Sequence, residues 1–146
     1  MVSENERIVA RWWDELWNGG DLAVADEIVA VDFTDHDPAS PWVPPGIAGC
    51  KVMVTGYRAA FPDLHFTIGQ QVAAGDTVVS HWRCRGTHRG ELLGIAPTGK
   101  LIDVEGISIL GLSGGKIRQQ TTVWDALGLM QQIGAVPTAA AAAGAV

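Results

Sequence analysis

The apolar residues of this chain change their spacing once, and that change restricts the fold more than any other feature. Up to about residue 61 they recur every three to four positions, the period of a helix with one buried face. From residue 64 to residue 124 they alternate with polar residues, as in strands with two unlike faces. Helices followed by a run of long antiparallel strands indicate an α+β fold rather than a doubly wound parallel sheet.

Three helices are predicted in the first part of the chain. Ser3 and Glu6 have the spacing of a capping box, and Asp21 is expected to cap the second helix. Glycines at 19 and 20 end the first helix, and a proline at 62 ends the third. The helices are expected at 3–18, 21–29 and 47–61, with a short strand at 31–34 before the proline-rich loop DHDPASPWVPPG.

Four further strands are predicted at 64–69, 77–85, 101–112 and 116–124. The last two form a hairpin about a Ser-Gly-Gly turn. A sheet this curved can wrap around the three helices and leave a cavity at its open end. We therefore expect a cone-shaped α+β barrel with an internal pocket, formed by residues 1–136 as a single domain. The alanine-rich segment 137–146 is expected to be a flexible tail.

Charge and composition exclude several classes of function. The 146 residues carry a net charge of −6 and no cluster of Lys and Arg, which argues against a nucleic-acid groove. No export signal or membrane span is expected, and the predicted location is the cytoplasm. Cys50 and Cys84 lack the spacing of a metal site and are expected to be free, buried thiols. No two histidines are close enough in sequence to suggest a metal site, and no nucleotide-binding or phosphate-binding glycine pattern is present, so neither a metal nor a cofactor is expected.

Aromatic side chains are abundant, and six of them are tryptophans. Indoles in such number usually fill a core or line an apolar cavity. In the last strand, the phase that starts at Ile117 is expected to face the pocket, and small polar groups on the hairpin could bind a substrate carbonyl. The residues assigned to the pocket wall are Trp13, Trp17, Trp42, Phe33, Tyr57, Phe61, Trp82, Ser108, Gln119 and Thr121.

Asp125 stands at the end of the last strand and directly before the predicted helix ALGLMQQI. A carboxylate beside a mostly apolar or neutral wall could shuttle a proton as an acid/base catalyst. The same position also suits an aspartate that caps the helix. The residues alone leave both roles open.

Two residues of the segment between the first strand and the third helix are further candidates. His36, in the sequence DHDP, could polarise a substrate carbonyl or support Asp125, or it could fix the loop through hydrogen bonds. Trp42 could form a lid over the pocket mouth or simply anchor the loop.

Three segments resemble the SnoaL-like polyketide cyclase (ester cyclase) family. They are FPDL at 61–64, GTHRGELLGIAPTGK at 86–100 and GGKIRQQTTVWDALGLMQQIG at 114–134, and DHDP at 35–38 is a weaker match. The resemblance covers nearly the whole chain except the alanine-rich tail. It implies the cone-shaped α+β barrel that is also used by ketosteroid isomerase and scytalone dehydratase.

The resemblance also implies an activity, which is ring closure of a polyketide ester by intramolecular aldol condensation without cofactor or metal. The acid/base aspartate of the family maps onto Asp125. The sequence departs from the family at Gln119 and Thr121, where relatives commonly have an acid and a tryptophan. Because these two positions differ from the family, the resemblance does not identify the substrate. The alternatives are isomerisation, hydrolysis or dehydration of a small hydrophobic compound, or binding without catalysis.

An open sheet face and the family both favour a homodimer or homotetramer.

Overall fold

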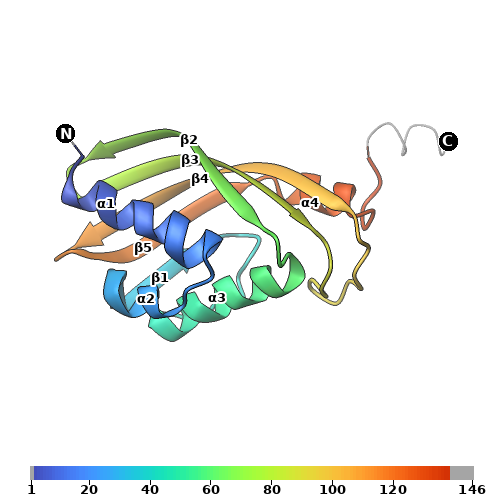
Figure 1. Ribbon diagram of the computed structural model, residues 1–146, viewed down its shortest axis with the longest axis horizontal. Helices are drawn as coiled ribbons and strands as arrows, with labels where there is room; N and C mark the ends of the chain where they lie inside the picture. The colour runs from blue at the N-terminus through green and yellow to red at the C-terminus, as the bar shows by residue number, and fades with distance from the viewer. Residues whose placement is uncertain (1, 139–146) are drawn as a thin grey trace.

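One curved sheet of five strands carries the structure, a computed structural model that describes residues 2–138 (Figure 1). The proposed tail therefore lies outside the described residues from 139 onward. The helices are α1 (Glu4–Arg11), which continues as the π-helix η1 (Trp12–Asn18), α2 (Ala23–Ile28), α3 (Gly46–Ala60) and α4 (Ala126–Gln132). The strands are β1 (Val29–His36), β2 (His65–Ala74), β3 (Thr77–Thr87), β4 (Leu101–Ser113) and β5 (Lys116–Trp124).

The strands lie in the order β1-β5-β4-β3-β2. The neighbours β2–β3, β3–β4 and β4–β5 are antiparallel, whereas β1 is parallel to β5, so the prediction of an antiparallel sheet is wrong at this edge. The strands β1 and β2 are the two edges, and the sheet is curved but not closed. The α+β class with helices first and a curved sheet after them is confirmed.

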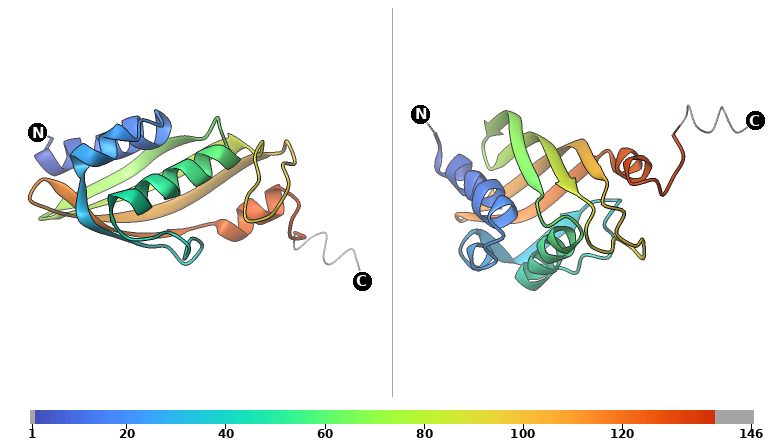
Figure 2. Two further views of the ribbon diagram at one scale, coloured as in Figure 1. Left: turned by 90° about the horizontal axis from the view of Figure 1, so that it is seen from below. Right: turned by 45° about the vertical axis from the view of Figure 1, so that its right-hand side comes forward.

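The helices α1, α2 and α3 cover the concave side of the sheet, and α4 lies at the opposite end from the start of α1 (Figure 2). The core fills the space between helices and sheet. Its largest fully buried side chains come from η1, β1, β4 and β5, and include Trp12, Leu16, Phe33, Leu110 and Ile117. This arrangement leaves the inward faces of β3, β4 and β5 opposite the tryptophans of η1.

Local sequence signals explain where the first helix begins. The backbone N–H of Glu6 donates to Ser3 Oγ and the backbone N–H of Ser3 donates to Glu6 Oε1, both at 3.2 Å, which is the predicted capping box. The second half of the helix is π-helical, a form that occurs often at functional sites. Edge strand β2 runs five residues beyond its predicted end at 69, because a register shift between Ile68 and Gln71 breaks the alternation that the prediction relied on.

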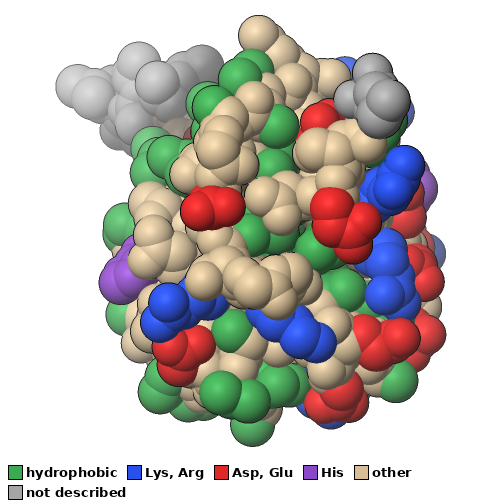
Figure 3. Space-filling model, turned by 90° about the vertical axis from the view of Figure 1, so that its left-hand side faces the viewer, with side chains coloured by type: hydrophobic (Ala, Val, Ile, Leu, Met, Phe, Trp, Pro, Cys, Tyr) green, Lys and Arg blue, Asp and Glu red, His purple; other side chains and the backbone are tan. Residues whose placement is uncertain are grey.

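The end of the molecule where α1 begins carries Lys and Arg side chains close to Asp and Glu, with apolar patches between them (Figure 3). Charges of both signs are therefore mixed on that face. No helix among residues 2–138 is long and apolar enough to cross a membrane.

Candidate active site

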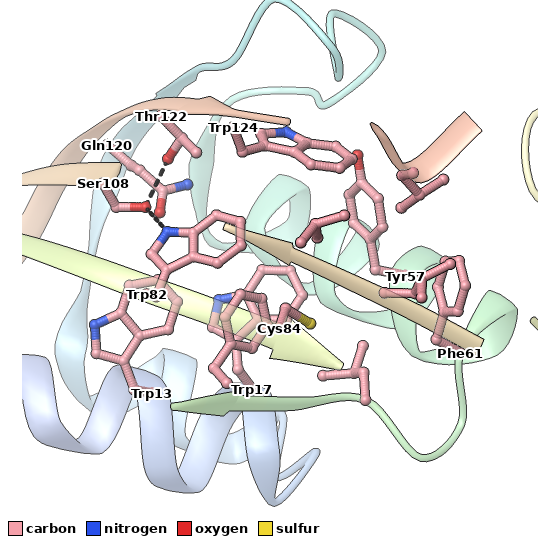
Figure 4. Close-up of a pocket in the computed structure, with 15 residues that line it drawn as sticks. Trp13, Trp17, Tyr57, Phe61, Trp82, Cys84, Ser108, Gln120, Thr122 and Trp124 are labelled. Carbon is pink, nitrogen blue, oxygen red and sulfur yellow. Dashed lines mark hydrogen bonds between the residues drawn. The ribbon is translucent and has the colours of Figure 1, made fainter. Parts of the chain in front are cut away.

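An apolar pocket lies between the concave face of the sheet and the helices (Figure 4). It encloses about 70 Å³. Its wall comes from η1, α3, α4 and all strands except β1. The lining residues are Trp13, Trp17, Tyr57, Phe61, Leu64, Phe66, Trp82, Cys84, Ile102, Val104, Ser108, Gln120, Thr122, Trp124 and Leu129.

No Asp, Glu, His, Lys or Arg is among these lining residues. Burial raises the pKa of Tyr57 and of Cys84 to about 12, so the phenol and the thiol are neutral near pH 7. The hydroxyl of Tyr57 is also hydrogen-bonded to that of Ser40. A pocket of this kind suits a neutral, flat and largely apolar molecule.

Two hydroxyl groups, those of Ser108 and Thr122, form a polar part of the wall. Trp82 Nε1 donates to Ser108 Oγ at 2.9 Å, and Ser108 Oγ is hydrogen-bonded to Thr122 Oγ1, also at 2.9 Å (Figure 4). All three side chains line the pocket, and all three are buried. The polar groups of β3, β4 and β5 thus meet at one place in an otherwise aromatic wall.

Two carboxyl groups of the segment from β1 to the following loop lie against the pocket wall. Gln120 Nε2 donates to Asp35 Oδ1 at 2.7 Å, and Trp124 Nε1 donates to Asp37 Oδ2 at 3.0 Å. Asp35 Oδ2 is buried and has no hydrogen-bond partner among the described residues. Burial raises the pKa of Asp35 above its usual range, and the nearby charge of Asp37 adds to this rise, whereas the bond from Gln120 opposes it.

Six of the sequence-predicted wall residues do line the pocket: Trp13, Trp17, Tyr57, Phe61, Trp82 and Ser108. Phe33 does not. It is fully buried in the core outside the pocket wall, where its ring packs on that of Trp12 at a centroid distance of 5.8 Å. The β1 strand to which it belongs contributes no lining residue.

Trp42 is exposed on the proline-rich loop and does not line the pocket. Its ring packs on the ring of Tyr57 at 5.9 Å, and its edge fits against Gly56 of α3. Tyr57 therefore lies between Trp42 and the pocket. The sequence left open whether Trp42 is a lid over the pocket mouth or an anchor of the loop. Its contact with Tyr57 and Gly56 is that of an anchor.

The prediction that Gln119 and Thr121 face the pocket is wrong. Leu112 pairs with Ile117 but Gly111 pairs with Gln119, so Arg118 is an extra residue in β5 and forms a bulge. A one-residue insertion turns every later side chain to the opposite face. Gln120, Thr122 and Trp124 consequently line the pocket in their place.

The prediction that Asp125 belongs to the wall of a closed pocket is also wrong. Trp124 faces the pocket, so the next residue points away from it, and Asp125 is exposed. Its Oδ1 accepts a hydrogen bond from the backbone N–H of Gly128 at 2.8 Å, which makes it the N-cap of α4. Its part in a reaction stays a prediction.

His36 is exposed on β1, and its Nε2 lies 3.5 Å from Thr34 Oγ1. Alternation along β1 places Asp35 on one face and His36 on the other. His36 therefore does not line the pocket, and the inward group of this segment is Asp35. A part for His36 in a reaction stays a prediction.

The sequence did hold a signal for the missed residues. The inward phase counted forward from Ile117 selects Gln119 and Thr121, whereas the phase counted back from Trp124 selects Gln120 and Thr122. Both ends of the strand can face inward only if it contains a bulge, and the pairing with β4 shows that it does. Among residues 2–138, no three His, Cys, Asp or Glu side chains are grouped so that they could hold a metal ion.

Fold and site together define a class of protein, namely a small α+β domain with an aromatic pocket between a curved sheet and its N-terminal helices. The model of the SnoaL-like polyketide cyclase family matches residues 7–133. The chain belongs to this family.

Solved structures support the assignment. A provisionally assigned polyketide cyclase from Acidithiobacillus ferrooxidans is 33% identical, with a TM-score of 0.82 over 91% of this chain and 96% of that one. A provisionally assigned SnoaL-like polyketide cyclase from Jannaschia sp. CCS1 is 27% identical, with a TM-score of 0.83 over 92% and 94%. TsrD from Streptomyces laurentii is 26% identical, with a TM-score of 0.82 over 91% and 96%. No curated protein is significantly similar to the chain in sequence.

Proposed function

We propose that this protein is a cofactor-independent enzyme of the polyketide-cyclase type, which closes a ring in a flat, apolar carbonyl compound by intramolecular aldol condensation. Family membership supports the type of reaction. The uncharged aromatic wall supports the type of substrate. The observation that carries the proposal is the half-buried carboxyl group of Asp35, with its buried Oδ2, beside Gln120 of the pocket wall, because ring closure needs a group that takes up a proton.

Asp35 has three properties of an acid/base group. Its Oδ2 is free of hydrogen bonds to the described residues, so it can accept a proton. Its pKa is raised by burial, which makes the carboxylate a stronger base. Its Oδ1 is held by Gln120, which fixes the direction of the free oxygen. We therefore assign to Asp35 the role that the family resemblance gave to Asp125.

The reaction balances without any further reactant. Asp35, directly or through one water molecule, takes a proton from a carbon that is flanked by two carbonyl groups. The resulting enolate carbon attacks a ketone carbon of the same molecule, and one C–C bond forms. The new alkoxide then receives the proton from Asp35, and the product is an isomer of the substrate.

The pocket must widen to admit such a substrate. Its volume of about 70 Å³ is well below the roughly 300–1,000 Å³ of typical ligand pockets. Tyr57 and Trp124 are the candidates to move, because their rings meet edge to face at 6.3 Å within the wall and each belongs to a different element.

The proposal is tested by comparing two aspartates. The methyl ester of an aromatic poly-β-ketone is incubated with the protein, and ring closure is followed by chromatography and absorbance, since the mass does not change. We expect Asp35→Asn to lower the rate by about 10²–10⁴, the usual contribution of an acid/base group. Asp125→Asn is the control, because asparagine also caps a helix. The wild-type rate should rise with pH through the raised pKa of Asp35.

Unchanged turnover in Asp35→Asn, or loss of turnover in Asp125→Asn alone, would contradict the assignment of Asp35. One observation favours a second candidate function, a protein that binds hydrophobic molecules without converting them: no carboxylate lines the pocket. Tight binding of the ester by the wild type without any ring closure would favour this binding protein over the enzyme.

A further inference from the structure

A row of polar side chains crosses the concave face of the sheet. Gln71 of β2, Ser80 of β3, Ser108 of β4 and Thr122 of β5 are successive cross-strand partners. Two tryptophans donate to the serines of this row. Trp13 Nε1 donates to Ser80 Oγ at 3.2 Å, just as the indole of Trp82 donates to Ser108.

The two serines differ in what remains of their hydrogen-bonding capacity. Ser80 accepts from the indole of Trp13 and donates its only hydroxyl hydrogen to Gln71 Oε1 at 3.0 Å. Ser80 therefore has no hydrogen left to donate, and it does not line the pocket.

Ser108 and Thr122 together have one hydroxyl hydrogen that is not donated in a hydrogen bond to the described residues. An indole N–H is only a donor, so Ser108 accepts from Trp82. The bond between the two hydroxyl groups uses one of their two hydrogens, whichever of them donates. Among residues 2–138, neither hydroxyl group makes any other hydrogen bond. One hydroxyl hydrogen is therefore left over, and both groups line the pocket.

We propose that the Ser108–Thr122 hydroxyl pair donates this remaining hydrogen to a carbonyl oxygen of the bound substrate. Figure 4 shows the pair at one end of the pocket, with the aromatic side chains extending away from it. A ligand with a flat apolar body and a carbonyl group at one end fits a pocket with hydroxyl groups at one end and aromatic side chains along the rest. No other hydroxyl group of the wall is free in the same way, because Tyr57 is already bonded to Ser40.

The consequence for the reaction follows from charge. When a proton leaves the carbon next to the carbonyl, negative charge develops on the carbonyl oxygen, and a hydrogen bond to a charged oxygen is about twice as strong as one to a neutral oxygen. A donor that is held in place before the reaction stabilises that charge without having to reorganise. This inference rests on the proposed function in taking the ligand to be a carbonyl compound, but its test measures binding and not turnover.

The test compares 1-indanone with indane, which have the same bicyclic skeleton but differ in the carbonyl group. Dissociation constants of both are measured by titration calorimetry, and the ratio of the indane to the indanone constant reports the preference for the carbonyl. In Ser108→Ala and in Thr122→Val one hydroxyl hydrogen stays free, so each single variant should keep the ratio within about twofold. The double variant is made together with Trp82→Phe and compared with Trp82→Phe alone, because the indole N–H that Ser108 accepts would otherwise be freed to donate to the ligand. No donor of this cluster then remains, and the ratio should fall about fivefold, as for the loss of one neutral hydrogen bond.

Ser80→Ala is the matched control, since it removes a serine of the same row whose hydrogen is already used. Its ratio should equal that of the wild type. An unchanged ratio in the double variant would overturn the proposal, and so would a loss in Ser80→Ala or in one single variant as large as that in the double variant.

A second measurement needs no variant and so does not depend on how the variants fold. The infrared stretching band of the 1-indanone carbonyl should move to lower frequency on binding to the wild-type protein than in an apolar solvent. A band at the apolar-solvent position, or no binding of 1-indanone, would overturn the proposal that the hydroxyl pair donates a hydrogen bond to the carbonyl group. Neither result depends on whether Asp35 catalyses ring closure.

Discussion

At the scale of single residues, Asp35 is a carboxyl group whose surroundings disfavour its charge. Burial raises its pKa, the charge of Asp37 raises it further, and the hydrogen bond from Gln120 and the nearby His36 lower it. A carboxyl group that is harder to ionise in the folded than in the unfolded chain favours folding only while it is protonated. That stabilisation is complete below the unfolded pKa of about 4 and is lost as the pH rises through the higher folded pKa.

The Asp35→Asn variant should therefore be more stable than the wild type at pH 7, because asparagine still accepts from Gln120 and carries no charge. Thermal unfolding should show the higher Tm at pH 7 and no difference near pH 3. Asp76→Asn, at an exposed turn, is the control. A lower Tm for Asp35→Asn at pH 7 would speak against a destabilising charge.

Among the elements, β4 is adapted to the tryptophans on either side of it. Gly106 pairs with Trp82 of β3 and with Trp124 of β5. A Cβ at Gly106 would lie 2.5 Å from Trp124 Cβ and closer still to the ring of Trp82. The glycine thus gives the two indoles the space in which they form the pocket wall.

Gly106→Ala should consequently destabilise the fold by about 1–3 kcal/mol, as overpacked cores do, and should weaken ligand binding. Chemical denaturation followed by tryptophan fluorescence measures the first effect. Gly69→Ala is the matched control in β2, where the nearest atom to the new Cβ lies at 3.7 Å, and its effect should stay within about 0.5 kcal/mol. Equal stability of the two variants would contradict the role given to Gly106.

At the scale of the whole molecule, the convex face of the sheet carries apolar side chains that are exposed among residues 2–138. Ile107, Ile109 and Val123 are exposed by 48%, 43% and 68%, and Ile107 is paired with Val123 across β4 and β5. Beside them, Arg83 is bonded to Asp103, so both signs of charge border the apolar side chains. A surface of this composition is suited to a second copy of itself.

We expect the protein to form a homodimer or a larger even assembly through this face. Ile109→Glu should convert it to a monomer, because the interface would bury an unpaired carboxylate. Val52→Glu changes an equally exposed aliphatic residue on α3 and should leave the assembly unchanged. Sedimentation velocity at micromolar concentration distinguishes these states, and a monomeric wild type would contradict the expectation.

The sequence alone was sufficient for the order of the elements, the fold class and much of the aromatic wall. Helical spacing, the Ser3–Glu6 capping box and most of the strand alternation are local properties, so they can be recognised along the sequence. Trp13 and Trp17 are four residues apart on one helix, so their shared inward face could also be inferred without a structure.

Only the tertiary structure decided which side chains of β5 face the pocket and which carboxyl group lies beside it. The bulge at Arg118 depends on how β5 pairs with β4, and it replaces Gln119 and Thr121 with Gln120 and Thr122. The contact of Asp35 with Gln120 joins positions 85 residues apart. Such contacts arise from strand pairing across the sheet, and a pattern read along one strand at a time does not contain them.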